Sequence, residues 1–142
     1  MICPLCQADN EITDVVLTSE AEGAGLALGA TLGGQRAALL MQSSGVGNCI
    51  NTFSLLRNCG IPCVILVTMR GEFADFNPWQ VPMGQAAKPA LEAIGVKCFP
   101  VDKPVEVGET FAAAADLAFH SRVSAAVLVS QRVIGAKGFG QQ

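Results

Sequence analysis

The chain has 142 residues, which suffices for one domain and not for two. Half of it (51%) is hydrophobic and only 15% is charged, against about 25% in an ordinary soluble domain. This composition excludes a disordered chain, and a net charge of −3 without a basic run excludes a typical nucleic-acid-binding surface. The longest dense apolar run, residues 61–69, is shorter than the roughly 20 residues that span a membrane. So few charges on a small domain predict that another chain covers part of its surface.

Six cysteines and one histidine raise the question of a metal or redox site. Cys3 and Cys6 form a Cys-x-x-Cys pair, but a structural zinc site needs a second such pair or paired histidines, and His120 has no companion. A redox pair of this spacing belongs between a strand and a helix rather than at the start of a chain. The sequence therefore predicts no metal site and reduced thiols. Because the first residues do not form a signal peptide, it also predicts a cytoplasmic protein.

Apolar and β-branched runs alternate along the chain with segments of helical composition. In chain order, the predicted elements are a strand at 14–18, a helix at 20–33, a strand at 37–42, a turn at 43–48 that opens a helix to about 58, a strand at 62–68, a loop at 70–82, a helix at 83–94, a strand at 96–101, a helix at 106–120 and a strand at 125–129. Strands that are apolar throughout are typical of a parallel sheet covered on both faces. The pattern predicts a single α/β domain, a three-layer α/β/α arrangement with a mostly parallel sheet.

Ligands of such folds bind beyond the carboxyl ends of the strands. The segment from Gln42 to Asn48 joins a strand to a helix through Ser43, Ser44 and Gly45, a geometry that presents backbone N–H groups to an anion or a polar ligand. It lacks the third glycine of a dinucleotide-binding motif and the Gly-Lys-Ser/Thr of a phosphate loop, which disfavours an NAD-binding oxidoreductase. The alternative is a tight turn in which a serine caps the helix.

Two other loops at this edge carry unusual polar residues. Glu20 follows the first predicted strand among small residues, where a carboxylate either donates and accepts protons or interacts with the dipole of the following helix. Arg70 begins a loop that also holds Trp79 and Gln80; this loop belongs either to an active site or to an interface, and Arg70 with Glu72 could also form a surface ion pair. His120 ends an Ala-rich helix, where it interacts with the helix dipole, and has no predicted catalytic role.

Four segments together resemble one enzyme family. Residues 18–34 (TSEAEGAGLALGATLGG) are similar to the pattern T-x-E-E-E-G-x-G-x-x-x-G-A-x-L-x-G, and residues 40–48 (LMQSSGVGN) are similar to L-M-Q-[NS]-S-G-[LV]-G-N. Residues 70–72 (RGE) and 81–85 (VPMGQ) match further. Over roughly residues 9–139, the chain resembles the pyrimidine-binding (PYR) domain of thiamine-diphosphate-dependent decarboxylases, in particular the sulfopyruvate decarboxylase alpha subunits and phosphonopyruvate decarboxylases.

The resemblance implies the thiamine-diphosphate-binding fold of PYR type and a 2-keto acid decarboxylase, a carboxy-lyase. In that family one PYR-domain glutamate hydrogen-bonds N1′ of the aminopyrimidine, and by motif position this residue is Glu20. The other expected cofactor-binding residues are Gln42, Ser43, Ser44, Gly45 and Asn48. Arg70 and Gln80 are candidates for contact with an acidic substrate.

The sequence also departs from the family pattern. Ala21 replaces the middle glutamate of the usual triplet, and no Gly-Asp-Gly…Asn stretch for diphosphate and Mg²⁺ follows. The N-terminal helix and strand of the family are expected to be missing. The resemblance therefore implies a homo- or hetero-oligomer with a PP-domain (beta-type) subunit that holds Mg²⁺ and the diphosphate, and no activity in the isolated chain. The alternative is a non-catalytic α/β binding or assembly module derived from this family.

Overall fold

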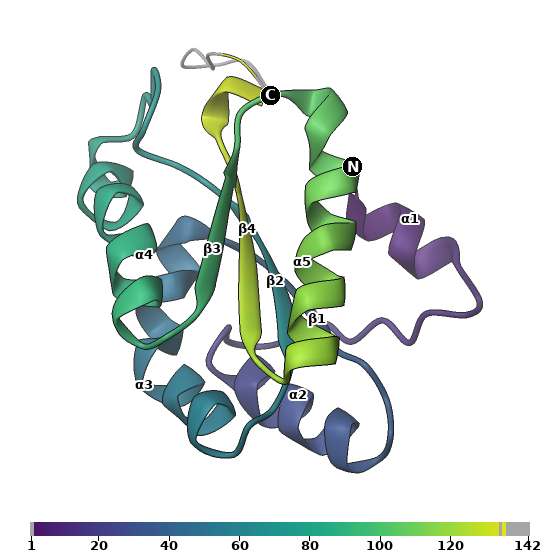
Figure 1. The fold of residues 1–142 in the computed structure, drawn as a ribbon. Helices are drawn as coiled ribbons and strands as arrows, with labels where there is room; N and C mark the ends of the chain where they lie inside the picture. Colours follow the sequence, from purple (N-terminus) through teal and green to yellow (C-terminus); the bar gives the residue numbers. More distant parts are fainter. Residues whose placement is uncertain (1, 134, 136–142) are drawn as a thin grey trace.

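The sheet at the centre of the structure has four parallel strands (Figure 1). The computed structural model describes residues 2–133 and residue 135, with side chains from residue 4 onward. The strands are β1 (Ala38–Gln42), β2 (Cys63–Thr68), β3 (Lys97–Val101) and β4 (Ser124–Val129), in the spatial order β1-β2-β4-β3. In register, Leu40 of β1 lies beside Leu66 of β2, which lies beside Val127 of β4. Because the strands are parallel, their carboxyl ends share one edge of the sheet.

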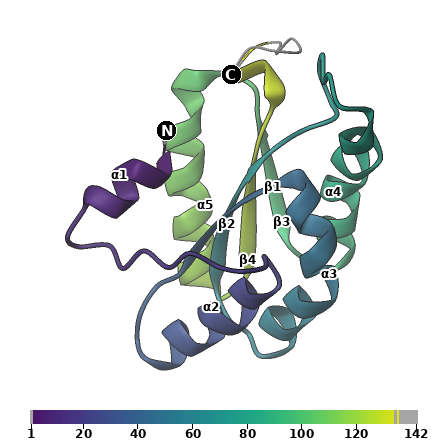
Figure 2. The ribbon, with the colours of Figure 1, turned by 180° about the vertical axis from the view of Figure 1, so that it is seen from behind.

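Helices cover both faces of this sheet. They are α1 (Ile2–Ala8), α2 (Glu22–Leu32), α3 (Ser43–Asn58), α4 (Val81–Ala93) and α5 (Val107–Ser121). Residues of α2, α3 and α4 pack against one face and residues of α5 against the other, an arrangement that Figure 2 shows from behind. Short 3₁₀ helices η1 (Pro78–Gln80), η2 (Pro104–Glu106) and η3 (Gln131–Val133) lie in the segments that follow β2, β3 and β4. The predicted three-layer α/β/α fold is confirmed.

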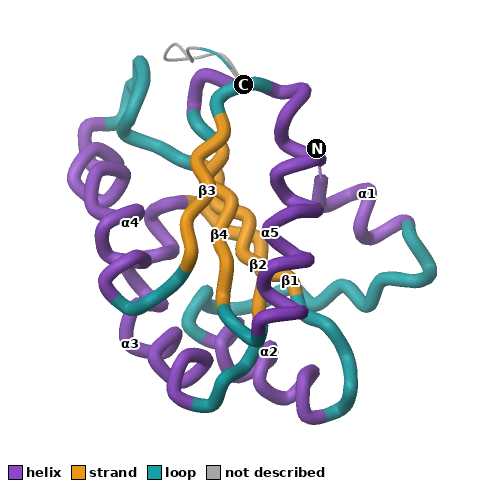
Figure 3. The backbone as a smooth tube through the Cα atoms, in the orientation of Figure 1, coloured by secondary structure: helices purple, strands orange, loops and turns teal. Residues whose placement is uncertain are grey.

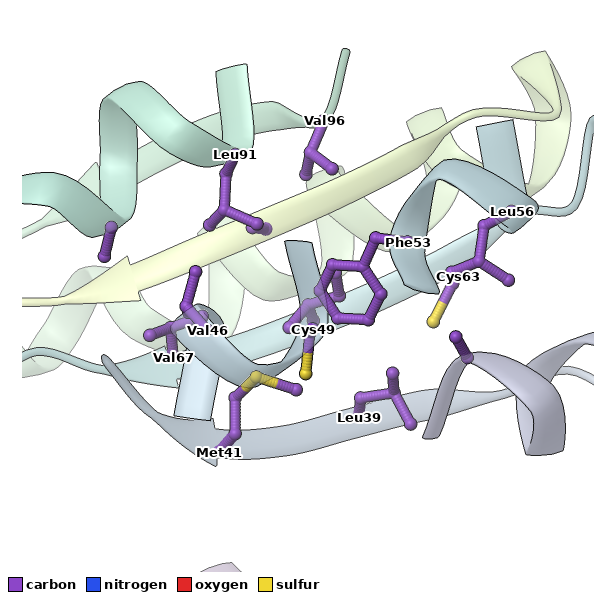
Figure 4. Close-up of a cluster of buried hydrophobic side chains, with 14 of the residues drawn as sticks. Leu39, Met41, Val46, Cys49, Phe53, Leu56, Cys63, Val67, Leu91 and Val96 are labelled. Atoms are coloured by element: carbon purple, nitrogen blue, oxygen red, sulfur yellow. The ribbon is translucent and has the colours of Figure 1, made fainter. Parts of the chain in front are cut away.

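The larger hydrophobic core lies between the sheet and the helices α2, α3 and α4. Figure 4 shows Val46, Phe53 and Leu56 of α3 in this core together with Leu91 of α4. All four side chains are at most 2% exposed. Burying side chains of this kind contributes roughly 1.5–3 kcal/mol each, so α3, the helix that begins at the predicted site, is the most firmly anchored helix of this face.

Most predicted strands and helices are confirmed within two residues at each end, but the predicted turn at 43–48 is already the start of α3, and the first predicted strand is wrong. Residues 14–18 form no strand, and Figure 3 shows them within the long loop before α2. Val16 is 83% exposed, so the β-branched run packs against nothing that would hold it in a ladder. Instead, the backbone N–H of Thr18 donates to Oε2 of Glu22 (3.0 Å). Within the described chain the sheet therefore has four strands rather than five.

A second difference is the helix α1, which sequence analysis did not predict. Its seven residues make only two turns, too few for a helical periodicity to show. Cys6 lies on it and is a free thiol, as are Cys49, Cys59, Cys63 and Cys98. The side chain of Cys3 lies outside the described residues, so the Cys3–Cys6 pair stays untested. No helix among residues 2–133 has the length and apolar character needed to cross a bilayer.

Two glycines let the loop after β2 cross the start of α4 in close contact. Gly71 has φ +72°, and a Cβ atom there would lie 2.5 Å from the carbonyl oxygen of Gln80. A Cβ atom at Gly84 would overlap the carbonyl oxygen of Arg70. The segments 70–72 and 81–85, which carried part of the resemblance, are thus packed backbone against backbone. This contact fixes where the loop 70–80 lies relative to the sheet.

We expect Gly84→Ala to lower the free energy of unfolding by about 2–3 kcal/mol, because the added methyl group would overlap the backbone carbonyl of Arg70. Gly108→Ala is the matched control, since Gly108 also lies in the first turns of a helix but has nothing within 4 Å of a Cβ position. That control should raise the stability by about 0.4–1 kcal/mol. Urea denaturation of both variants measures the difference; equal stabilities would contradict the close crossing.

Candidate functional site

The carboxyl edge of the sheet brings together three segments that are distant in sequence. The loop before α2 places Glu20 against the first turn of α3, which begins directly after β1. The hydroxyl oxygen of Ser43, the first residue of α3, accepts a hydrogen bond from the backbone N–H of Arg70 (3.0 Å), which follows β2. The structure therefore brings the predicted segments together at this edge, although Glu20 reaches it from a loop and not from the end of a strand.

Glu20 lies against the backbone of Gly45. A Cβ atom at position 45 would stand 2.6 Å from both Cγ and Oε1 of Glu20, so any residue larger than glycine would displace this carboxylate. The other oxygen, Oε2, accepts a hydrogen bond from Nδ2 of Asn48 (3.0 Å), one turn further along α3. A glycine that gives room and an amide that donates thus fix the carboxylate at the start of the helix.

The environment of Glu20 favours its ionised form. The hydrogen bond from Asn48 is the main cause that lowers the pKa of this carboxyl below the usual 4.5; a backbone N–H bond adds to it, and partial burial opposes it. Cys49 lies next to the pair, and its thiol donates to the carbonyl oxygen of Gly45 (3.2 Å). Burial, aided by the charge of Glu20, raises the pKa of Cys49 to about 11, so this thiol stays protonated and is no nucleophile.

The polar residues at the start of α3 divide into exposed and buried ones. Ser44 is exposed, and its hydroxyl donates to Oε1 of Gln42 (2.7 Å). Asn48 is also exposed, which leaves its amide accessible beside Glu20. Ser43 is fully buried and its oxygen is engaged by the N–H of Arg70, so its contribution is to join the first turn of α3 to the loop after β2. The first turn of α3 offers backbone N–H groups and the positive end of the helix dipole at this point.

The guanidinium of Arg70 is held by Asp75 rather than extended toward Glu20. Its Nε and Nη2 donate to the two carboxylate oxygens of Asp75 at 2.9 and 2.8 Å. The side chain of Asp75 is only 2% exposed, and it also accepts from the backbone N–H groups of Gly71 and Asn77. The hydrogen bonds from Arg70 hold the pKa of Asp75 well below its usual range, so the pair is ionised at neutral pH. Arg70 thereby organises its own loop.

Gln131, which sequence reasoning missed, completes this network from the segment after β4. Its Oε1 accepts from the backbone N–H groups of Glu72 (2.9 Å) and Phe73 (3.0 Å), and its Nε2 donates to Oδ2 of Asp75 (2.9 Å). It is 6% exposed. Arg132 stacks over the ring of Phe73 at 4.3 Å. A single glutamine after an apolar strand carries no signal in sequence, because its partners are backbone groups about 60 residues away.

The end of the loop 70–80 lies outside this network and is partly exposed to solvent. Trp79 is 88% exposed, while Oε1 of Gln80 is buried and has no hydrogen-bond partner among the residues that the structure describes. A cleft of 410 Å³ lies on the other side of the loop, lined by Met69, Gly71, Glu72, Gly84, Gln85, Lys88, Pro89, Pro100 and Leu128. Neither Glu20 nor the first turn of α3 lines this cleft. The site around Glu20 is an open surface of the described chain.

Comparisons with known proteins agree with the motifs found in the sequence. No protein-family model matches the chain. It is 37% identical to the sulfopyruvate decarboxylase subunit alpha of Methanococcus maripaludis over 122 residues, which cover 85% of this chain and 73% of that one. The corresponding subunit of Methanothermobacter thermautotrophicus is 33% identical over 129 residues (90% and 78%). The chain belongs to the sulfopyruvate decarboxylase alpha-subunit family.

A phosphonopyruvate decarboxylase of Streptomyces viridochromogenes is a further relative of this alpha-subunit-type chain. It is 31% identical over 123 residues, which are 84% of this chain but only 31% of the relative. The resemblance to the PYR domains of thiamine-diphosphate-dependent decarboxylases is therefore confirmed at the level of the family. The same region occurs both as a separate subunit and as about a third of a longer decarboxylase chain.

We expect Gln131→Leu to release the loop 70–80 of this alpha-subunit-type chain. The substitution keeps the volume but leaves the N–H groups of Glu72 and Phe73 without their acceptor and removes one of the donors to Asp75, which costs about 1–3 kcal/mol of unfolding free energy. Trp79 is the only tryptophan, so its fluorescence anisotropy reports on the loop and should fall. The exposed Gln35, replaced by Leu, serves as the control. Anisotropy and stability that equal those of the control would contradict the anchoring role of Gln131.

Proposed function

We propose that this chain is the pyrimidine-binding subunit of a thiamine-diphosphate-dependent 2-keto acid decarboxylase, with Glu20 as its catalytic residue. One observation carries the proposal: an ionised, partly exposed carboxylate is fitted against Gly45 and held by Asn48 in a member of the alpha-subunit family. The names of the relatives favour a substrate like sulfopyruvate or phosphonopyruvate, a 2-keto acid with a second acidic group.

The residues around Glu20 fit an aminopyrimidine. A flat ring with donor and acceptor atoms requires an ionised carboxylate, small neighbours and exposed polar groups, and Glu20, Gly45 and Ser44 supply these. We assign Gln42, Ser44 and Gly45 to the pyrimidine side, and Ser43 and Asn48 to the support of this side, Ser43 through the N–H of Arg70 and Asn48 through the carboxylate of Glu20. When bound, the cofactor supplies the electron sink for loss of carbon dioxide. The part of Glu20 is to accept a hydrogen bond and hold a proton at its carboxylate.

We propose that the loop 70–80 contributes a contact to the substrate. Gln80 is the better candidate, because its buried Oε1 has no partner in the described chain. Arg70 already donates two hydrogen bonds to Asp75, so we assign it the role of holding the loop in its conformation. The guanidinium of Arg70 is thus engaged within the chain, and we propose that the second acidic group of the substrate is bound by another polypeptide.

That polypeptide is a beta-type subunit that carries the diphosphate and Mg²⁺ site. The relatives named subunit alpha imply a second subunit, and in the phosphonopyruvate decarboxylase the matching region is only 31% of the chain. The open surface around Glu20 suits this arrangement, because a proton-transfer site needs walls that exclude water. A partner seated on the carboxyl edge would supply them.

We expect Glu20→Gln to lower kcat of the complex at least about 10²-fold, the range for a proton-transfer group, without loss of the fold. Glu22→Gln is the matched control, since that carboxylate bonds the backbone of Thr18 and should leave most of the turnover. The measurement is carbon dioxide release from sulfopyruvate, phosphonopyruvate and pyruvate, with thiamine diphosphate, Mg²⁺ and the co-purified partner chain.

Each arm of this screen decides one part of the proposal. Unchanged turnover of Glu20→Gln would exclude Glu20 as the catalytic residue. Turnover by this chain without a partner would contradict the shared site. A wild-type complex that assembles but decarboxylates none of the 2-keto acids would favour a non-catalytic assembly module instead.

A further inference from the structure

We propose that Asn48 is a positioning residue that fixes the carboxylate of Glu20, rather than a residue that contacts the cofactor. The inference deepens the proposed function and rests on it for the chemical purpose of Glu20. The contact itself is independent of that purpose: Nδ2 of Asn48 donates to Oε2 of Glu20 at 3.0 Å across 28 residues of sequence.

The two oxygens of Glu20 have different surroundings. Oε2 is occupied by the amide of Asn48, whereas Oε1 lies over the Cα atom of Gly45 and receives no hydrogen bond from another side chain of the described residues. Rotation of the carboxylate would break the bond to Asn48. The amide therefore selects one orientation of the carboxylate and leaves Oε1 without a side-chain donor among the described residues.

Among the described side chains, Asn48 is the one that donates a hydrogen bond to the carboxylate of Glu20. From α3, Cys49 is the neighbouring titratable group, and it is a protonated thiol directed at the carbonyl of Gly45. On the side of Glu20 itself, Glu22 is turned back to the N–H of Thr18. None of the described lysines and arginines forms an ion pair with Glu20; Arg70, Lys88 and Lys103 pair with other carboxylates.

The sequence places this amide where it can act. Asn48 lies one helical turn after Ser44 on the exposed side of α3, while Val46 and Cys49 are buried on the opposite side and lock the rotation of the helix about its axis. The donor is thus carried by a rigid element, and the loop that bears Glu20 is the partner that must adapt. A donor on a rigid helix is what holds a catalytic group in one geometry.

The test follows the titration of Glu20 in the full chain, labelled with ¹³C at the glutamate carboxyls and assigned by the loss of one signal in Glu20→Gln. We expect a wild-type midpoint below that of ordinary glutamate. Asn48→Leu should move it upward because the donor is lost while burial persists, and Asn48→Gln should restore part of the shift. Asn51→Leu, one turn further along α3, is the control and should titrate as wild type. A wild-type midpoint in Asn48→Leu would overturn the proposal.

A second readout separates positioning from binding. In the complex, Asn48→Leu should lower kcat, with the acidic limb of its pH profile moved to higher pH, while the apparent affinity for thiamine diphosphate stays unchanged. Weaker cofactor binding with unchanged kcat would overturn the positioning role. Failure of the proposed function has a different signature, because it would leave the titration result intact while Glu20→Gln keeps full turnover.

Discussion

The contact between Glu20 and Gly45 is the constraint on which the site depends. Only a residue without a side chain allows the carboxylate to lie 2.6 Å from a would-be Cβ position, at the point where β1 ends and α3 begins. The apolar residues of α3 bury themselves against the sheet and so fix that point in space. Asn48, one turn further on, holds the carboxylate in place. The chemistry of one loop residue is thus set by the packing of a helix.

The loop 70–80 also lies at the carboxyl edge of the sheet, where a buried polar network fixes its conformation. Its shape comes from Arg70, Asp75 and Gln131, an ion pair and an amide that are largely removed from water. A buried network of this kind stabilises one loop conformation only when every member is satisfied, and here the backbone N–H groups of the loop complete it. Through Ser43, which accepts from the N–H of Arg70, the loop is tied to the first turn of α3. Trp79, near the end of this loop, stays exposed to solvent.

Much of this arrangement is predictable from sequence because it depends on local patterns. The strands β1, β2 and β4 follow from the apolar runs of the sequence, and the course of α3 to Asn58 follows from its helical composition. The predicted turn at 43–48 is absent, because α3 begins directly after β1. The run 14–18 misleads because strand composition alone does not supply a partner, and Val16 stays 83% exposed. The roles of Asn48 and Gln131 lie beyond sequence reasoning, since each depends on a hydrogen bond to a distant residue. The sequence makes Arg70 a candidate for contact with the substrate. Its hydrogen bonds to Asp75 depend on the fold of the loop, which no sequence motif predicts.

The most direct test of the central claim compares Gly45→Ala with Gly47→Ala in the complex with its partner chain. At position 45 the methyl group meets Glu20, whereas at position 47 it meets only the flexible end of Met83, 2.9 Å from its sulfur. With both variants shown to be folded, the account predicts that Gly45→Ala lowers kcat as severely as Glu20→Gln, at least about 10²-fold, and that Gly47→Ala keeps most of the activity. Full turnover in Gly45→Ala would contradict it.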